Sequence, residues 1–198
     1  MSQSTGQEMN ALTKESIFTA LMILMKEKDY NSITITDLTK KAGVSRMAYY
    51  RNYQTKEDII IKHMDEIFDE YVKEVIHSYH EDFSSIYVAF FRHFRKHHEM
   101  VEVLIQADLT DLILQQFDGY ISFIEKGIFQ KLVGNKIDKY ELYYAAGGLY
   151  KILIEWVKGG MKESDEEMAT TVMKMSEYLT LDFDFNALHK TMPFHKLK

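Results

Sequence analysis

The chain has 198 residues, 46% hydrophobic and 27% charged, a balance that excludes an intrinsically disordered protein and allows one large or two small domains. It contains no cysteine, which excludes a disulfide framework and thiolate chemistry and fits a reducing cytoplasm. No apolar run approaches the ~18 residues that span a bilayer, and the N-terminus lacks the pattern of a signal peptide. We therefore expect a cytoplasmic protein that is not inserted in a membrane.

The formal net charge of −6 is distributed unevenly along the chain. Residues 1–56 hold eight Lys and Arg against five Asp and Glu, a balance of +3, so the remaining residues carry −9. A basic N-terminal part on an acidic body is the asymmetry expected when only one end of a protein meets phosphate groups.

Helices are the expected secondary structure throughout. A single proline and nine glycines over this length favour helices, and no stretch alternates as a strand would. Residues 1–10 are polar, and we expect them to be frayed. The first helix is predicted from about Thr13 to Lys28, where apolar residues recur at helical spacing: Ile17, Ala20, Leu21, Leu24 and Met25.

The next stretch, TITDLTKKAGVSRMAYYRNYQTK, predicts two short helices joined by a tight turn. Thr34 and Asp37 form a capping box at the start of the first helix. Gly43 can take a positive φ and end that helix, and Ser45 can cap the second helix, Arg46–Arg51. This is the helix-turn-helix pattern, and its second helix carries more aromatic and basic side chains than it can bury. Such a surface suits a polyanion.

A long helix, from about Lys56 to Tyr79, is predicted next because Thr55 and Asp58 form a second capping box. We expect the N-terminal headpiece (residues 1–55) and the body (residues 56–198) to be mechanically coupled, since no Gly-, Ser- or Pro-rich linker separates them. Five further helices follow, giving an all-α chain of about nine helices. Two more capping boxes mark helix starts in the body, Asp138 with Glu141 and Ser164 with Glu167.

The helix predicted over residues 138–158 is apolar on nearly all sides, so it must be buried on all sides. In a domain of this size, one side is expected to pack on the body and the other on a second chain. Gly147 and Gly148 in mid-helix disfavour the helix by about 1 kcal/mol each relative to Ala. Close approach of a partner helix would offset that loss.

The segment AGVSRMAYYRNYQTKEDII closely resembles the signature of the TetR/AcrR-type regulators. In that family an AGVS-type turn precedes an aromatic-rich recognition helix, and a [ST]-K-[ED] sequence starts the fourth helix. The body resembles the shorter members from low-GC Gram-positive bacteria in helix pattern alone. Three positions depart from the family pattern: Thr39 stands where Ala is usual, Asn52 where His is frequent and Gln54 where Pro is frequent.

The resemblance implies a homodimer whose last two helices form a four-helix interface, a palindromic DNA operator, and a small-molecule inducer bound in the body. Residues 1–55 would be the DNA-binding domain and residues 56–198 the regulatory and dimerisation domain. The residues expected at the dimer interface are Ala146, Gly147, Tyr150, Ile154, Val172, Met175 and Leu179.

We assign Arg46 and Met47, with Thr36 as a further candidate, to base edges, since Arg can donate two bonds to guanine and Met can touch a thymine methyl. The complete set of expected DNA contacts is Thr34, Thr36, Ser45, Arg46, Met47, Tyr49, Tyr50, Tyr53 and Lys56. Tyr49 and Tyr53 fit the headpiece core as well as they fit a DNA contact. Arg51 also fits a plain solvated charge.

A ligand pocket in the body would be lined by aromatic and methionine side chains, although such stripes are more often plain core. Its candidate residues are Phe90, Phe94, Met100, Leu104, Phe117, Tyr120, Ile124, Tyr143, Tyr144, Tyr150 and Trp156. His93 and His97 have a spacing that can bind a metal, but nothing nearby completes a site, and His77 with His80 is no better. We expect no metal, no cofactor and no catalytic site.

Together these features predict a homodimeric repressor released from a palindromic operator by a small-molecule ligand. The alternative is a DNA-binding dimer without a small-molecule inducer, controlled by a protein partner. A third reading is a helical enzyme or interaction module that has lost DNA binding, against which the +3 headpiece argues. The sequence leaves open the choice between repressor and activator and the role of residues 181–198.

Overall fold

The computed structural model describes residues 2–78, 83–124 and 139–178. Over these ranges the chain forms nine α-helices and one short 3₁₀ helix, with no strand, which confirms the all-α prediction. The 3₁₀ helix spans Tyr30–Ser32. The α-helices are α1 Ser2–Glu27, α2 Ile35–Ala42, α3 Arg46–Asn52, α4 Glu57–Ser78, α5 Phe83–Lys96, α6 His98–Gln106, α7 Thr110–Ile124, α9 Lys139–Lys158 and α10 Asp165–Tyr178.

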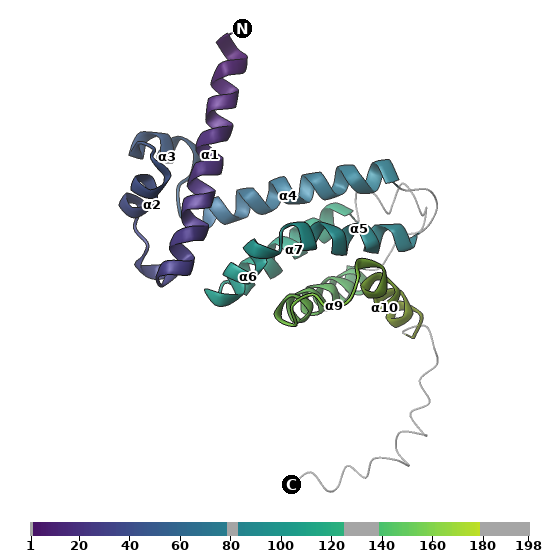
Figure 1. Cartoon of the computed structure of the whole chain (residues 1–198). Helices are drawn as coiled ribbons and strands as arrows, with labels where there is room; N and C mark the ends of the chain where they lie inside the picture. Colours follow the sequence, from purple (N-terminus) through teal and green to yellow (C-terminus); the bar gives the residue numbers. More distant parts are fainter. Residues whose placement is uncertain (1, 79–82, 125–138, 179–198) are drawn as a thin grey trace, which may run out of the picture.

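The N-terminus of α1 departs from the sequence prediction. The helix begins at Ser2 and not near Thr13, and its first turns project beyond α2 and α3 (Figure 1). Thr13 is interior, because its hydroxyl donates to the carbonyl of Met9 at 2.8 Å, and Ser16 donates to Leu12 at the same distance. These back-bonds place both residues inside the helix, so Thr13 is not its first residue. The expectation of a frayed segment was therefore wrong.

The headpiece closes around one apolar core. Ile17 and Leu21 of α1, Leu38 of α2 and Tyr49 of α3 have no exposed surface. Because α2 and α3 are too short to be stable alone, this shared burial holds them as helices. The pair α2 and α3 lies on the far side of α1 from the body (Figure 1). The helix-turn-helix prediction is confirmed.

The predicted capping boxes position the helix starts. Thr34 Oγ1 accepts from the Asp37 N–H at 3.1 Å, and the Asp37 carboxylate accepts from the Thr34 N–H at 3.0 Å. The same reciprocal pair joins Thr55 with Asp58 before α4, at 3.2 Å in both directions. Ser164 with Glu167 repeats it before α10. The predicted box at Asp138 lies outside the described residues.

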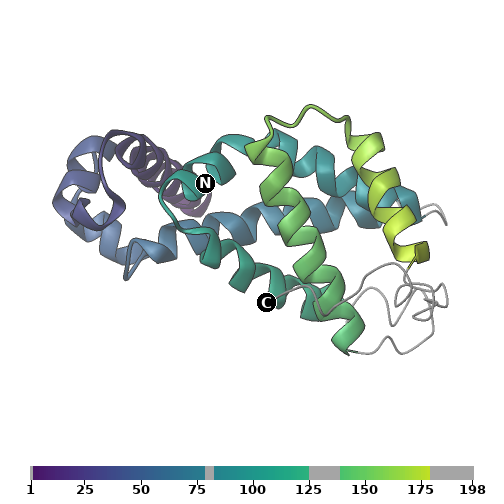
Figure 2. The ribbon, with the colours of Figure 1, turned by 90° about the horizontal axis from the view of Figure 1, so that it is seen from below.

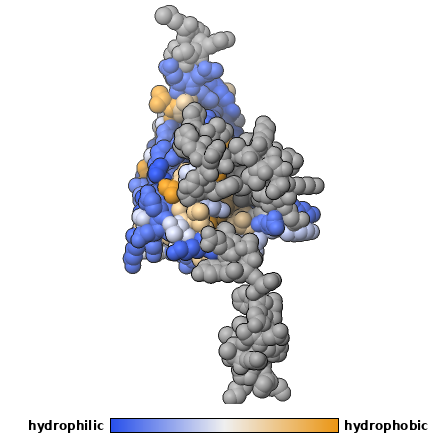
Figure 3. Space-filling view, turned by 90° about the vertical axis from the view of Figure 1, so that its right-hand side faces the viewer, coloured by the Kyte–Doolittle hydropathy of each residue, from blue (hydrophilic) through white to orange (hydrophobic). Residues whose placement is uncertain are grey.

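The helix α4 runs from the headpiece into the body, where α5 and α7 pack on it. Helix α9 covers α6 and α7, and α10 packs against α5 at the end far from the headpiece (Figure 2). None of the described helices is both long and apolar enough to cross a membrane. On the face drawn in Figure 3 the described residues are mainly hydrophilic, with a few hydrophobic residues among them.

Arg95, near the end of α5, fixes the turn between α9 and α10. Its Nε donates to Asp165 Oδ1 at 2.8 Å, and its Nη1 and Nη2 donate to the carbonyls of Met161 and Glu163 at 3.0 and 2.6 Å. The guanidinium also lies 4.7 Å from the centre of the Trp156 ring. One planar side chain therefore ties together segments about 60 to 70 residues apart in the sequence.

Two histidines lie where α5 crosses α4: His93 is buried, and His97, which follows the last residue of α5, is half-buried. The Nε2 of His93 lies 2.7 Å from the carbonyl of Ile67, and the His93 and His97 rings lie 4.9 Å apart. Burial lowers the pKa of His93. Burial, His93 and Lys96 lower the pKa of His97 to about 4, although Glu70 opposes the shift. Both rings are therefore neutral at neutral pH.

These histidines predict acid sensitivity. A histidine whose folded pKa is depressed stabilises the fold above its unfolded pKa of 6.5, and that stability is lost as the pH falls towards the folded pKa of about 4. The urea midpoint, followed by circular dichroism, should fall between about pH 6.5 and pH 5, before most carboxylates protonate. His97→Gln should reduce this fall, whereas His98→Gln, outside the pair of His93 and His97, should keep it. An equal fall in both variants would contradict the assignment.

Candidate nucleic-acid interface

The corner between α2 and α3 is set by Gly43, whose φ of +67° lies in the left-handed region. Its N–H donates to the carbonyl of Lys40 at 3.3 Å, and the Val44 N–H donates to the carbonyl of Thr39 at 3.0 Å, which closes the end of α2. Any side chain at this backbone geometry would be strained. Thr39 is buried, and its hydroxyl donates to the carbonyl of Ile35 at 2.9 Å, so its departure from the family pattern leaves no unpaired group.

Ser45 caps α3 by accepting from the Ala48 N–H at 3.0 Å. The seven-residue helix then buries Tyr49 and Asn52 and exposes its other face. On that face Met47 is 78% exposed and Tyr50 53% exposed, next to the exposed side chain of Arg46. An isolated apolar Met on the surface is unremarkable, but here it shares an exposed helix face with a guanidinium and a phenol. The outer face of α3 thus offers hydrogen-bond donors and one thioether.

The predictions that Tyr49 and Tyr53 contact DNA were wrong. Tyr49 has no exposed surface and Tyr53 has 4%, so neither side chain can reach a phosphate. Tyr49 packs edge-on against Tyr50, with 5.2 Å between ring centroids, and lies 5.9 Å from the Tyr53 ring. Burial raises the pKa of each of these two hydroxyls to about 12. They belong to the headpiece core.

Asn52 is also buried, and its Nδ2 donates to the carbonyl of Ala48 at 3.0 Å. The side chain that replaces the family's frequent His therefore faces the core.

The side chain of Lys56 contacts Tyr30 within the headpiece. Its Nζ donates to the carbonyl of Tyr30 at 2.7 Å and lies 4.3 Å from the centre of the Tyr30 ring. The expected contact of Lys56 with DNA stays a prediction.

Thr34, Thr36 and Ser45 are exposed, as a DNA contact requires. The hydroxyl of Thr34 donates to Asp37 Oδ2 at 2.8 Å. A hydrogen bond from Lys28 and two from Thr34 lower the pKa of Asp37, so this carboxylate stays ionised and holds the start of α2. These hydrogen bonds fix the backbone that carries Thr36.

The cations of the headpiece divide into two groups. Four form ion pairs: Lys28 with Asp37 at 2.7 Å, Lys41 with Glu27 at 2.8 Å, Lys14 with Glu66 at 3.3 Å and Lys26 with Glu99 at 3.6 Å. Three others are exposed and make no ion pair with any residue that the structure describes: Lys40, Arg46 and Arg51. This second group is available to phosphates.

The predicted dimer residues fall into two environments. Ala146, Ile154 and Val172 are buried within their own chain, so they cannot form the surface of an interface in this conformation. Gly147 and Met175 are exposed. Tyr150 is half-buried with its hydroxyl 3.4 Å from the carbonyl of Thr110, and Leu179 lies outside the described residues.

One side of α9 exposes aromatic rings, and the sequence analysis assigned two of them, Tyr143 and Tyr144, to a ligand pocket. Tyr140 and Tyr144 are 68% and 64% exposed, and Tyr143 is 51% exposed, which contradicts its assignment to an enclosed pocket. With Gly147 they occupy consecutive turns of one side of the helix. Their spacing of three to four residues was the available signal.

The other pocket candidates lie mainly in packed core. The ring centroids of Phe90 and Phe94 are 4.8 Å apart, and Phe117 lies 6.0 and 5.8 Å from them. Met100, Leu104 and Trp156 are buried. Tyr120 stacks on Phe68 at 3.9 Å and donates to Asp65 at 3.1 Å. The side chain of Ile124 lies outside the described residues, and Tyr144 is on the surface.

Two family descriptions match the chain. Bacterial regulatory proteins of the tetR family match residues 17–62, and a transcriptional regulator C-terminal region matches residues 81–178. The first match covers the helix-turn-helix and the start of α4, and the second covers α5 to α10.

Two curated relatives are similar to part of the chain. The HTH-type transcriptional regulator AlkX of Mycobacterium tuberculosis is 27% identical over 85 residues, which are 43% of this chain and 40% of AlkX. IcaR of Staphylococcus epidermidis, a negative transcriptional regulator of the biofilm operon icaADBC, is 24% identical over 71 residues, 36% of this chain and 38% of IcaR. The chain thus matches about two fifths of the length of each relative.

Among solved structures, Lin0861 from Listeria innocua has the same fold, with a TM-score of 0.72 and 16% identity over 86% of this chain and 92% of that one. The two family matches include α3 and extend to Tyr178, the last residue of α10. The chain therefore belongs to the TetR family of bacterial transcriptional regulators.

Proposed function

We propose that the chain is a homodimeric repressor that binds a palindromic operator through α3 and is released by a small-molecule ligand. The observation that carries the DNA part is the outer face of α3, where Arg46, Met47 and Tyr50 are exposed while Tyr49 anchors the helix. Repression is favoured because IcaR, one of its relatives, is a negative regulator.

In this proposal each exposed side chain has a separate role. Arg46, at the first position of α3, donates to a guanine edge in the major groove, and Met47 touches a thymine methyl. The hydroxyl of Tyr50 and the cations of Lys40 and Arg51 bind phosphates and fix the register of the helix. Residues 1–55 form the DNA-binding domain and residues 56–198 the regulatory and dimerisation domain, in the cytoplasm.

The aromatic face of α9 supports the homodimer. Three exposed tyrosines around Gly147 leave apolar ring surface in water, and a second copy would cover it. Nothing lies within 4 Å of a Cβ built on Gly147, so the site has room for an approaching helix. The packing of Phe90, Phe94 and Phe117 against one another favours the second candidate, a DNA-binding dimer that a protein partner controls without an inducer.

Two tyrosine variants test the role of α3. Tyr50→Phe removes an exposed hydroxyl and should weaken operator binding about fivefold, the equivalent of one hydrogen bond of ~1 kcal/mol. Tyr49→Phe removes a buried hydroxyl that has no hydrogen-bond partner among the described residues, so it should leave operator binding unchanged and raise the free energy of unfolding slightly. Fluorescence anisotropy and urea titration measure the two quantities. Equal losses of affinity in both variants would contradict the assignment of the two faces.

Selection of bound duplexes from a random pool tests the operator. The enriched sequences should be palindromic, because a two-fold dimer presents α3 twice. Binding of the selected duplex should fall steeply as salt rises, by ~10³-fold or more between about 50 and 200 mM if about six phosphates are contacted. A duplex with one half-site scrambled is the control. Enrichment of single, non-repeated sites would contradict a symmetric dimer.

Gly147→Leu tests the interface on α9. A Cβ at this position has no atom of the described residues within 4 Å, so the fold should be retained while a close partner helix is displaced. Sedimentation velocity should show the mass falling from dimer to monomer. Lys151→Leu, one turn along the same helix, is a control for added apolar volume. An unchanged mass for Gly147→Leu would exclude close packing at this position.

A further inference from the structure

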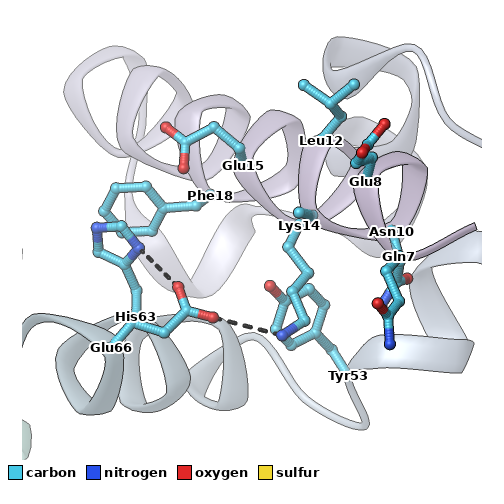
Figure 4. Close-up of a pocket in the computed structure, with 11 residues that line it drawn as sticks. Gln7, Glu8, Asn10, Leu12, Lys14, Glu15, Phe18, Tyr53, His63 and Glu66 are labelled. Carbon is cyan, nitrogen blue, oxygen red and sulfur yellow. Dashed lines mark hydrogen bonds and ion pairs between the residues drawn. The ribbon is translucent and has the colours of Figure 1, made fainter. Parts of the chain in front are cut away.

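A groove of about 800 Å³ lies between the N-terminal half of α1 and the start of α4, outside the helix-turn-helix surface and the body core. Figure 4 shows the two walls: α1 supplies residues from Gln7 to Phe18, and α4 supplies His63 and Glu66. Tyr53, immediately after α3, lies at its base. The volume is that of a site for a small organic molecule.

The base of the groove is aromatic. The ring of Phe18 stacks on the imidazole of His63, with 3.5 Å between centroids and 19° between planes. Tyr53 adds a third ring, buried to 4% exposure. Stacked rings of this kind offer an apolar surface, and the faces of Phe and Tyr rings also attract cations.

The walls of the groove are acidic. Glu8, Glu15 and Glu66 line it against a single lysine, Lys14. Glu66 lies 3.3 Å from the Lys14 ammonium and 3.8 Å from His63 Nδ1, whereas Glu15 makes no ion pair with any residue in the described ranges. The negative potential reaches the base, because burial and then Glu66 and Glu15 raise the pKa of Tyr53 to about 12. Burial lowers the pKa of His63, so its neutral ring does not offset the carboxylates.

We propose that this groove binds a small organic cation, with its charged centre between the carboxylates of Glu15 and Glu66 and its apolar part on the Phe18 ring. An occupant would touch α1, α4 and the residue that follows α3, which are the three segments that set the direction of the recognition helix. Occupancy of the groove is therefore a means of regulating operator binding, a consequence that rests on the proposed function. The binding of the cation to the groove does not rest on the proposed function.

Two ions of one shape and opposite charge test the site on the full chain. Tetraphenylphosphonium should bind at least about tenfold more tightly than tetraphenylborate by isothermal titration calorimetry, because the walls favour a cation. Equal affinities would overturn the proposal.

Glutamine variants locate the charge. The double change Glu15→Gln and Glu66→Gln should weaken tetraphenylphosphonium binding at least about tenfold. Glu74→Gln is the matched control, since Glu74 is a carboxylate of the same helix that pairs with Arg92 at 3.4 Å and does not line the groove. Its affinity should stay within about twofold of the parent. Unchanged binding in the double variant would overturn the assignment.

The nuclear magnetic resonance signal of the His63 imidazole shows where tetraphenylphosphonium binds, and it requires no change to the carboxylates. Its Cε1–H resonance, identified by its loss in His63→Gln, should shift during the titration while that of His93 does not. A His63 resonance that stays in place would overturn the proposal even if the double variant failed to fold. If selection with the ligand-free chain enriched no duplex, the proposed function would be refuted. The binding of tetraphenylphosphonium to the groove would still stand.

Discussion

The direction of the recognition helix depends on the burial of one side chain, that of Tyr49. The helix α3 has only seven residues, too few to be stable alone, and Tyr49 is its one large side chain with no exposed surface. Full burial of a ring of this size contributes roughly 1.5–3 kcal/mol, more than the Ser45 cap at about 1 kcal/mol. With Tyr49 inside, the helical period turns Arg46, Met47 and Tyr50 outward. The core thus fixes which residues can meet DNA.

A second constraint is the packing of α4, which carries the headpiece on the body. Three carboxylates spaced four residues apart on α4 pair with cations: Glu66 with Lys14, Glu70 with Lys96, and Glu74 with Arg92. These pairs are exposed and contribute about 0–1 kcal/mol each. The opposing apolar stripe contributes more, because each buried side chain adds roughly 1.5–3 kcal/mol. Its buried members are Ile59, Ile60, Met64, Ile67, Tyr71 and Val75. Burial therefore sets the angle of α4, and the ion pairs refine it.

Local rules predicted the starts of α2, α3, α4 and α10, because a capping box such as Thr34 with Asp37 and a turn such as that at Gly43 depend on neighbouring residues alone. The sequence could not show that Tyr49 is buried and Tyr50 is exposed. The two residues are adjacent in a helix of only seven residues, and so short a helix has too few apolar residues to define its buried face. The helical N-terminus of α1 was missed because its exposed turns have no apolar stripe. The groove over His63 was missed for another reason: it arises where α1 crosses α4, a tertiary arrangement that no local pattern encodes.

The central claim is that two copies of α3 are held at a fixed spacing by buried helices and not by flexible linkers. Because the chain has no cysteine, Gln54→Cys introduces a single position for a spin label on each headpiece. Double electron–electron resonance on the selected operator should give one narrow distance, compatible with recognition helices about 34–36 Å apart. The absence of a dipolar signal, or a broad distribution that the operator does not narrow, would contradict the account.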